Sequence, residues 1–575
     1  MVFCITRKRL SVLAAVMLVA VFSFGAYAAE DKPLEPAGFA ASGVSELKAM
    51  QPQLDGSGVK IGVISRSLTY LNGIPQSDYL CDVKQPCLTD ANLSFYDVKG
   101  LGRQAGMSGH NTKVCSILFG LDPNAYSRQI GDFNYAGAVP EAEGKVYEFW
   151  HFVYANVFEG KDCGVDLLTA SFGSGFEDWW TRGIDAMVEQ EGIIVVAAIG
   201  NGQDVFDLPL YPAAGANAIG VGVVDSVGNS SATPEYFALA NPKHSSAGPT
   251  IDGRCKPDIV APGNFLVPKD NAKGEYEPAG NWSSFSTPMA AGAAGLLLQK
   301  VKEDAELSRI ISADGGNCVI KAILMNSAAK LPYWHKGKVA KDDDHAVPLD
   351  YVQGAGMLNA LAAYQNLVAG RQGQGEVNNL GWDKDTLDKT AAFEKVYQLK
   401  IDEPNDKMIT ATAVWNVHYS DKYPFEAAAD ENSNLRLEVW AVDVNEPQKN
   451  YMLDYSDSNV DNVEHVYCKS DANFTNYEIV VSYSGTESGG RNQVYGAAWH
   501  VSRADAKDNI LWYDLNVDGV VDEADIEIIS SRAAGAADTT LNEALGDING
   551  DGRIDADDIG LLAAQKNRQA DWFGK

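Results

Sequence analysis

Short apolar runs alternate with stretches of helical character between residues 55 and 368, and this alternation limits the folds open to the chain. Residues 59–64 and 193–199 are short runs rich in valine and isoleucine, and residues 179–191, between them, have helical character. Buried apolar strands that alternate with helices are typical of a parallel sheet covered by helices on both faces. We therefore predict an α/β domain over residues 55–368, with functional loops at the carboxyl ends of its strands.

The N-terminus has the pattern of a secretory signal peptide. Residues 7–9 are basic, residues 10–24 are apolar, and residues 26–28 offer small side chains for cleavage. We predict a signal peptide over residues 1–28 and a polar lead segment over residues 29–54. No later apolar run is long enough to span a bilayer. The mature chain is therefore expected to have no transmembrane span and to be secreted or associated with the cell surface.

The C-terminal part of the chain changes composition twice. Residues 369–381 are rich in Gly, Gln and Asn, which predicts a linker. Strand-like segments then dominate residues 382–503, which predicts an all-β sandwich or jelly roll. These segments are Val396–Ile401, Met408–Trp415, Leu435–Val442 and Tyr477–Tyr483. Residues 507–575 hold an internal repeat, two similar acidic loops that are each followed by a helical stretch.

Charge and cysteine content exclude some classes of partner. The chain has 77 acidic against 46 basic residues, a net charge of −31. Because phosphate binding requires Lys and Arg, we expect no nucleic-acid partner. Eight cysteines include Cys4 in the signal peptide, which leaves an odd number in the mature chain. Cys81 and Cys87 are close together in a loop-like stretch, so they are the pair for which we predict a disulfide.

Three residues in separate segments supply the groups that nucleophilic hydrolysis needs: a nucleophile, a base and an oxyanion donor. Ser284 precedes a run of small residues that can form a buried helix, and a helix N-terminus offers free N–H groups. His110 opens a second apolar helix, and Asn201 follows an apolar strand with its amide free to donate. Each residue alone is more simply an N-cap serine, a surface histidine or a turn asparagine. Their conjunction, in this order, is far more specific.

The segments around these residues resemble the conserved blocks of subtilisin-like serine proteases. The histidine block is Gly109–Thr112, the oxyanion block is Ala198–Asn201, and the nucleophile block is Ser283–Pro288. Further matching stretches are Gly137–Ala142, Tyr211–Ala213, Ser245–Thr250, Asp252–Gly263 and Gly354–Ala360. The resemblance implies a subtilisin-like fold and a serine endopeptidase that cleaves polypeptides. It assigns the base to His110, the nucleophile to Ser284 and an oxyanion donor to Asn201.

The resemblance also implies that Ser171, Phe172 and Gly173 form the edge segment that pairs with the substrate backbone. One part of the pattern is missing. The first strand of the family ends in the triad aspartate, whereas Ser65 stands at that position here.

Loss of the acid weakens such an enzyme without abolishing it. In subtilisin the acid alone is worth roughly 3 × 10⁴ in kcat, less than the serine or the histidine. Asp78, Asp82 and Asp97 are nearby carboxylates whose distance from His110 the sequence does not give. Trp282 and Ser283 also depart from the usual glycine and threonine. Two hypotheses stay open: a weak or specialised endopeptidase, and an impaired pseudo-protease that binds peptides or docks to a scaffold.

The two C-terminal loops have the oxygen pattern of calcium sites. Side chains supply positions 1, 3, 5, 9 and 12 of each loop, and a backbone carbonyl supplies position 7. The predicted Ca²⁺ ligands are Asp514, Asn516, Asp518, Val520, Asp522 and Asp525 in the first loop, and Asp547, Asn549, Asp551, Arg553, Asp555 and Asp558 in the second. With the following helices, predicted over 526–532 and 559–565, the repeat resembles a type I dockerin. That resemblance implies a small helical module that binds a cohesin-type scaffold protein.

Overall fold

The computed structural model describes residues 38–568 apart from residues 129, 176–178, 203–207, 227–236, 241–243, 313, 332–333, 338–342, 391–392, 406, 429–431, 486–491, 504–512, 514, 516–519, 535–547 and 549–552. The predicted signal peptide lies outside the described residues. Within them, every helix is too short or too polar to cross a membrane.

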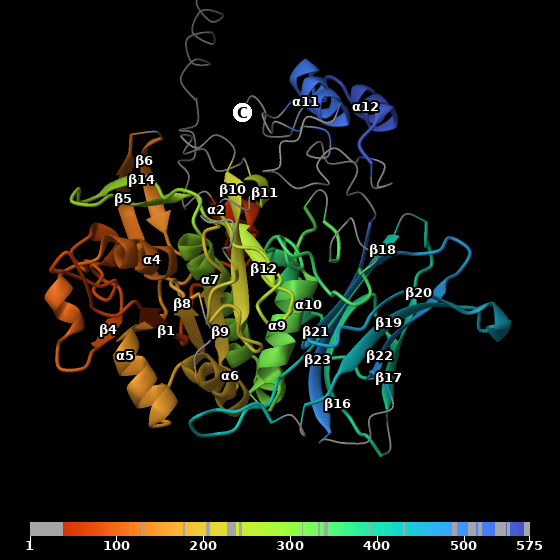
Figure 1. Cartoon of the computed structure of the whole chain (residues 1–575), viewed down its shortest axis with the longest axis horizontal. Helices are drawn as coiled ribbons and strands as arrows, with labels where there is room; N and C mark the ends of the chain where they lie inside the picture. The colour runs from red at the N-terminus through yellow and green to blue at the C-terminus, as the bar shows by residue number, and fades with distance from the viewer. Residues whose placement is uncertain are drawn as a thin grey trace, which may run out of the picture.

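A mainly parallel sheet forms the centre of the N-terminal domain, with strand order β11-β10-β9-β8-β1-β7-β4 and β12 beside β10. Its strands are β1 (Lys60–Ser65), β4 (Leu93–Tyr96), β7 (Glu143–Glu148), β8 (Leu167–Ala170), β9 (Ile194–Ala198), β10 (Ile219–Ser226), β11 (Phe237–Ala240) and β12 (Ile259–Pro262). Among the pairs that the described residues form in this sheet, β10–β11 is antiparallel and the others are parallel. The predicted α/β architecture is confirmed, with helices around the sheet in Figure 1.

Helices cover both faces of the central sheet, because its strands have apolar side chains on both faces. Ile61 and Val63 of β1 belong to one core cluster, together with residues of α4 (Gly109–Phe119) and α7 (Ser283–Glu303). Ile64 faces the opposite cluster, beside α6 (Trp179–Glu191). The first cluster also includes residues of α2 (Gly38–Ala41), α3 (Val44–Met50), α8 (Ala305–Ile311), α9 (Gly316–Asn326) and α10 (Ala360–Val368), and the second includes residues of α5 (Phe149–Phe152) and the π-helix η3 (Val153–Phe158). The lead segment therefore contributes to the core through α2 and α3.

Helix α7 runs through the interior and is buried from Phe285 to Leu298. Small residues allow this close packing, since a Cβ added at Gly292 would lie 2.3 Å from the Cβ of Ala138. Smaller elements complete the domain: the hairpin β2 (Thr69–Leu71) and β3 (Ile74–Gln76), a sheet of β5 (Leu121–Ser127), β6 (Gly131–Ala136), β13 (Leu266–Pro268) and β14 (Glu275–Pro278), and the 3₁₀ turns η1 (Pro86–Leu88) and η2 (Gly102–Ala105).

Two packed sheets form the second domain. One has the order β15-β17-β22-β19-β20 and the other β16-β23-β18-β21. Their strands are β15 (Gly375–Val377), β16 (Leu380–Leu387), β17 (Glu394–Lys400), β18 (Lys407–Trp415), β19 (Leu435–Val442), β20 (Tyr451–Ser456), β21 (Val463–Lys469), β22 (Asn476–Tyr483) and β23 (Gln493–Arg503), with the turn η4 (Pro447–Lys449). The region 369–381 is not wholly a linker, because β15 pairs with β17 and β16 begins at Leu380.

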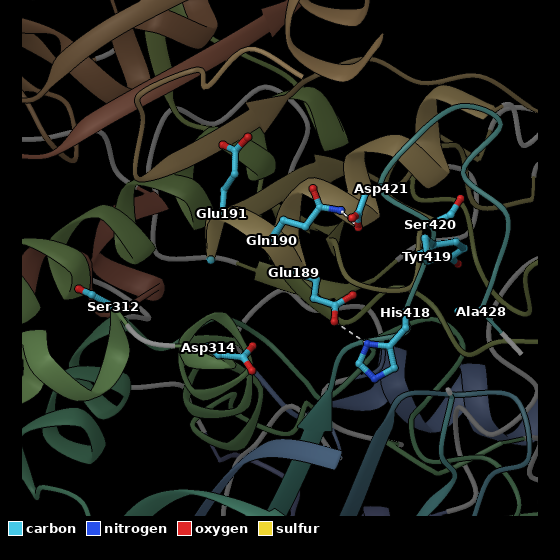
Figure 2. Close-up of a pocket in the computed structure, with 11 residues that line it drawn as sticks. Glu189, Gln190, Glu191, Ser312, Asp314, His418, Tyr419, Ser420, Asp421 and Ala428 are labelled. Carbon is cyan, nitrogen blue, oxygen red and sulfur yellow. Dashed lines mark hydrogen bonds and ion pairs between the residues drawn. The ribbon is translucent and has the colours of Figure 1, made fainter. Parts of the chain in front are cut away.

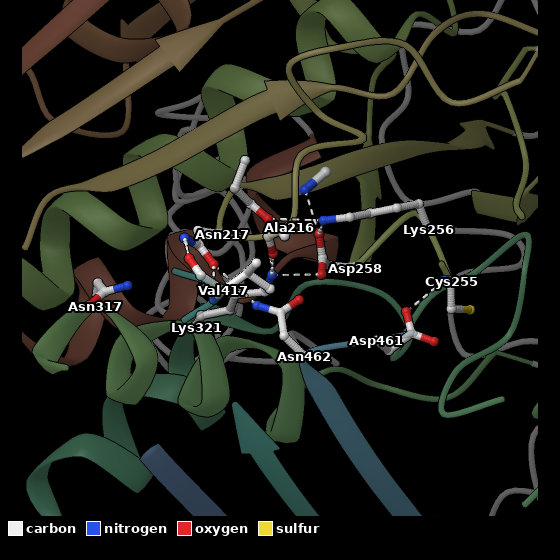
Figure 3. Close-up of polar contacts among 12 residues, drawn as sticks. Ala216, Asn217, Cys255, Lys256, Asp258, Asn317, Lys321, Val417, Asp461 and Asn462 are labelled. Carbon is white, nitrogen blue, oxygen red and sulfur yellow. Dashed lines mark hydrogen bonds and ion pairs between the residues drawn. The ribbon is translucent and has the colours of Figure 1, made fainter. Parts of the chain in front are cut away.

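The sandwich packs against the α/β domain through α9 and α10, as Figure 1 shows. Buried polar groups fix this junction (Figure 3). The Asn217 side chain accepts a hydrogen bond from Val417 N at 2.8 Å and donates one to Val417 O at 2.9 Å. Asp461 of the sandwich accepts a hydrogen bond from Cys255 N at 2.7 Å. Such paired polar contacts stabilise one relative position of the two domains.

An acidic recess of about 740 Å³ opens at the same junction (Figure 2). Glu189, Glu191, Asp314 and Asp421 line it, and His418 Nδ1 lies 2.5 Å from Glu189. This recess is at the amino-terminal edge of the sheet, because α6 ends at Glu191 and β9 begins shortly afterwards. It is therefore opposite the edge that carries functional loops in parallel sheets.

The C-terminal region contains α11 (Glu523–Ala533) and α12 (Ala556–Ala563). Both helices begin earlier than predicted, since Asp522 and Asp555 act as N-caps with complete capping boxes. A small core joins the two repeats: Tyr513, Leu515, Val521, Ile529, Ile548 and Leu562.

The predicted Cys81–Cys87 disulfide is wrong for this structure. Both residues are among the described cysteines, which are all free thiols. Their side chains are instead buried in the first core cluster, where a free cysteine behaves as a small hydrophobic residue.

Candidate active site

His110 lies in the first turn of α4, as predicted. Ser108 caps this helix by accepting a hydrogen bond from Asn111 N at 3.1 Å. The imidazole packs against Phe285 of α7, with ring centroids 5.8 Å apart, and its side chain is 32% exposed. The cap and the aromatic contact fix His110 where α4 meets the first turn of α7.

Burial favours the uncharged form of the imidazole. Loss of solvent is the main cause that lowers the pKa of His110 from its ordinary value of 6.5. The Asp78 carboxylate opposes this shift, while Arg66 and Lys113 add to it. A general base must be unprotonated to accept a proton, so a lowered pKa suits that role near pH 7.

Ser284 is the second residue of α7 and is half-buried. Its hydroxyl donates to Ser171 O at 3.3 Å, and the Ser171 hydroxyl donates to Ser284 O at 2.8 Å. Because Ser171 directly follows β8, these reciprocal bonds hold the predicted nucleophile at the carboxyl edge of the sheet.

Asn201 follows β9, and hydrogen bonds from Ser283 of α7 fix its side chain. Its side-chain oxygen accepts hydrogen bonds from Ser283 N at 3.0 Å and from the Ser283 hydroxyl at 2.8 Å. Fixing the oxygen leaves the amide NH₂ as the group that can donate to a ligand. Sequence reasoning treated Ser283 only as a departure from the usual threonine and missed this orienting contact, which any hydroxyl at this position can make.

The predicted substrate edge, Ser171–Gly173, runs from the end of β8. No described residue forms a hydrogen bond with the backbone of Phe172 or Gly173. Immediately beyond, Ser174 and Tyr211 exchange two backbone hydrogen bonds of 2.9 and 2.8 Å. The edge is therefore held at one end while the peptide groups of Phe172 and Gly173 stay available for strand addition.

The acid position is occupied by Ser65, the last residue of β1. Its hydroxyl is buried and has no hydrogen-bond partner among the described atoms. Of the three nearby aspartates, only Asp78 forms an ion pair with His110 within the described residues, with Oδ2 3.8 Å from Nδ1. The Asp82 carboxylate instead accepts from Lys84 N at 3.0 Å. The sequence analysis included Asp78 among three candidate carboxylates, but nothing in the sequence distinguishes it from Asp82 and Asp97.

Trp282 does not line the small cavity around His110 in the described structure. It is the N-cap residue of α7, and its ring packs edge-on against His244 at 6.4 Å. The sequence left open whether Trp282 crowds the substrate pocket or packs beside it, and its contact with His244 is a packing contact.

The calcium-loop region is described only in part. The predicted ligands Asp514, Asn516, Asp518, Asp547, Asn549 and Asp551 lie outside the described residues. Position 12 is alike in both repeats, because Asp525 and Asp558 are buried and accept backbone N–H bonds from their own loops. An all-oxygen donor set with buried carboxylates suits a hard cation such as Ca²⁺.

Comparisons with known proteins agree with this arrangement. The model of the subtilase family matches residues 84–375, and the model of the dockerin type I domain matches residues 512–565. The subtilisin-like protease SBT6.1 of Arabidopsis thaliana is 26% identical over 268 residues, which cover 45% of this chain and 22% of that protein. The serine protease AprX of Bacillus subtilis is 28% identical over 161 residues, 25% of this chain and 35% of AprX. The chain thus spans about a third or less of these relatives.

Two solved proteases also align with the chain. The prenylagaramide maturation protease PagA is 20% identical, with a TM-score of 0.38, and covers 56% of this chain and 98% of PagA. The patellamide maturation protease PatA is 23% identical, with a TM-score of 0.37, and covers 55% of this chain and 98% of PatA. Because the family model matches more than half of the 575 residues, the chain belongs to the subtilase family and carries a dockerin type I domain.

Proposed function

We propose that this chain is an exported serine endopeptidase that uses Ser284 as the nucleophile. His110 takes the proton of the Ser284 hydroxyl as that oxygen attacks the scissile carbonyl, and then gives it to the leaving amine. The Asn201 amide and a free N–H at the start of α7 stabilise the oxyanion. The substrate backbone pairs with Ser171–Gly173 as an added strand.

The observation that carries this proposal is the orientation of Asn201. Its oxygen is held by both the backbone and the hydroxyl of Ser283, the residue next to Ser284. An amide fixed in this way has its donors prepared for a developing negative charge, which is where such groups contribute most to catalysis.

A second candidate is a pseudo-protease that binds peptides without cutting them. It is favoured by the Ser284 hydroxyl, whose hydrogen bond goes to Ser171 O and not to His110 among the described contacts. Activation then requires the hydroxyl to turn towards the imidazole. Hydroxyl rotation is a small motion, and catalytic hydrogen bonds often form only when substrate binds.

A serine-reactive phosphonate separates the two candidates. We expect covalent labelling of the full chain, detected by mass spectrometry, and no labelling of Ser284→Ala. Ser286→Ala is the matched control, since its hydroxyl lies in the same helix but donates to Ser283 O at 3.1 Å. An unlabelled wild-type chain that also fails to hydrolyse denatured protein would leave the pseudo-protease as the remaining candidate.

We also propose that the dockerin domain binds Ca²⁺ and attaches the protease to a cohesin-type scaffold outside the cell. Ca²⁺ would be held by the side chains of Asp522 and Asp525 and the carbonyl of Val520, with the equivalent residues Asp555, Asp558 and Arg553 in the second loop. The bound ion would neutralise the acidic loops and hold the two helices in the arrangement that a partner recognises.

Calorimetric titration of the chelator-treated full chain is expected to show uptake of two Ca²⁺ ions per dockerin. Asp558→Asn removes one ligand charge and should abolish tight binding at the second loop. Asp557→Asn changes the neighbouring exposed carboxylate and should leave both sites intact. Equal behaviour of the two variants would contradict the ligand assignment.

A further inference from the structure

A short hairpin separates the end of β1, where the aspartate of the family is missing, from a segment that lies beside that strand end. Strand β1 ends at Ser65, the hairpin β2–β3 follows, and residue 78 comes back beside Arg66. Two hydrogen bonds close this loop onto Arg66 O: Asp78 N donates at 3.3 Å and the Ser77 hydroxyl at 3.0 Å. A carboxylate from a later segment thus lies next to the strand end where the family places its aspartate.

We propose that Asp78 replaces the triad aspartate as the residue that orients His110, an inference that rests on the proposed serine-protease function. Asp78 is a positioning residue in this role, since it acts on substrate only through the imidazole. It holds the Nδ1–H tautomer, leaves Nε2 free to accept the Ser284 proton, and stabilises the imidazolium that forms.

The segment that carries Asp78 is bound to the first turns of α4. Ser108 N donates to Leu80 O at 2.7 Å, Asn111 Nδ2 to Tyr79 O at 2.8 Å, and Asp82 N to the Thr112 hydroxyl at 2.8 Å. Because His110 belongs to that helix, these bonds fix the carboxylate and the imidazole relative to each other. A surface ion pair between two free side chains would lack such support.

The two carboxylate oxygens have different neighbours. Oδ1 accepts a hydrogen bond from the Ser108 hydroxyl at 3.2 Å, so Asp78 is also bound to the N-cap residue of α4. Oδ2 lies 3.8 Å from His110 Nδ1, and that nitrogen is buried with no hydrogen-bond partner among the described atoms. The carboxylate is therefore the group positioned to satisfy Nδ1.

Space for this approach exists because position 65 is a serine. A cavity of about 10 Å³ lies between Ser65, Asp78 and His110, roughly what one water molecule requires. A small rotation of Asp78, or one bridging water, joins the carboxylate to Nδ1. An aspartate at position 65 would occupy the same space.

Arg66 weakens the interaction of Asp78 with His110, compared with an aspartate that binds the histidine alone. Its Nε lies 3.2 Å from Asp78 Oδ2, so the guanidinium and the imidazole compete for one oxygen. The charged groups that act on His110 are Asp78, Arg66 and, on its own helix, Lys113. The contacting residues of α7 and of the β8 edge, Phe285 and Ser171, are uncharged.

Peptide hydrolysis by Asp78→Asn tests the proposal directly. We expect kcat to fall about 10²–10⁴-fold with little change in KM, up to the loss of about 10⁴ that removal of a triad acid causes. In the pH profile of kcat/KM, the acid limb should move to lower pH. The negative charge of Asp78 stabilises the imidazolium, so its removal lowers the pKa of His110. Asp82→Asn is the matched control and should retain wild-type rates. A purely structural role would lower the melting temperature without moving the limb.

Two further variants keep the test decisive if Asp78→Asn folds poorly. Arg66→Gln removes the competing cation and should move the acid limb to higher pH. The double variant Ser65→Asp/Asp78→Asn returns a carboxylate to the strand end and should recover at least about tenfold of the lost kcat, as expected for a restored positioning acid.

The outcomes separate this inference from the proposed function. Wild-type turnover together with an Asp78→Asn rate within twofold of wild type would overturn the role of Asp78 alone. A wild-type chain with no turnover and no phosphonate labelling would overturn both proposals.

Discussion

Replacing His110 by alanine will lower kcat for peptide hydrolysis by up to about 10⁶-fold, the loss from an intact triad, to a residual rate set by substrate binding and the oxyanion donors. Without the imidazole, the Ser284 hydroxyl attacks with no base to take its proton, and the leaving amine departs with no acid to protonate it. KM should change little, because the backbone edge at Ser171–Gly173 and the Asn201 amide are untouched. A fluorogenic peptide assay with the full chain measures both parameters.

His345→Ala is the matched control for this prediction. His345 is partly exposed and stacks on Tyr455 of the sandwich at 4.1 Å between ring centroids, and it does not line the cavity around His110 in the described structure. It should retain the wild-type rate. Residual activity of His110→Ala close to that of the control would mean that another group serves as the base.

The pH profile gives a second measure of the same residue. Since burial lowers the pKa of His110 below 6.5, the acid limb of kcat/KM for the free enzyme should lie below pH 6.5. Protonated His110 cannot accept the serine proton, so activity rises with pH through that pKa and not above it. An acid limb at pH 7 or higher would show that the Asp78 carboxylate raises the pKa of His110 more than burial lowers it.

Local pattern predicted most of the secondary structure near the site. The helix expected at residues 179–191 has those bounds as α6, and β1 and β9 differ from expectation by about one residue at their ends. These elements could be predicted because apolar periodicity indicates a helix and runs of β-branched residues indicate a strand, each within a single segment. Ser284 and His110 likewise lie in the first turns of α7 and α4, because the residues that start these helices are adjacent in sequence.

Non-local contacts explain what the sequence did not predict. Which of Asp78, Asp82 and Asp97 approaches His110 depends on tertiary contacts. The chain after the β2–β3 hairpin returns beside His110 with Asp78, through bonds to Arg66 and Ser108. No periodicity encodes those contacts. The strand β15 was missed for a similar reason, because it forms by pairing with β17, a segment some 20 residues later.

Asp258→Asn should be the most destabilising single substitution at the domain junction, by about 3–5 kcal/mol in the free energy of unfolding. Asp258 lies between two buried lysines, 2.5 Å from Lys256 Nζ and 3.0 Å from Lys321 Nζ (Figure 3). The three side chains are 1–4% exposed. Asparagine has nearly the same shape but no charge, so the variant leaves two buried lysines without a counter-ion. Urea unfolding at pH 7, followed by tryptophan fluorescence, measures the loss.

The pH dependence distinguishes an unpaired charge from a packing defect. Burial lowers the pKa of Lys256, and the Asp258 carboxylate is the main group opposing that shift. Without it the pKa falls further, so the lysine becomes neutral at a lower pH than in wild type. The loss of stability should therefore be largest below neutral pH and shrink as pH rises towards 9. Asp402→Asn, which changes a carboxylate that is 81% exposed beside Lys400, itself 71% exposed, is the control and should cost about 1 kcal/mol or less. A destabilisation of Asp258→Asn that stays constant from pH 6 to pH 9 would contradict the assignment of the lysine charges as its cause.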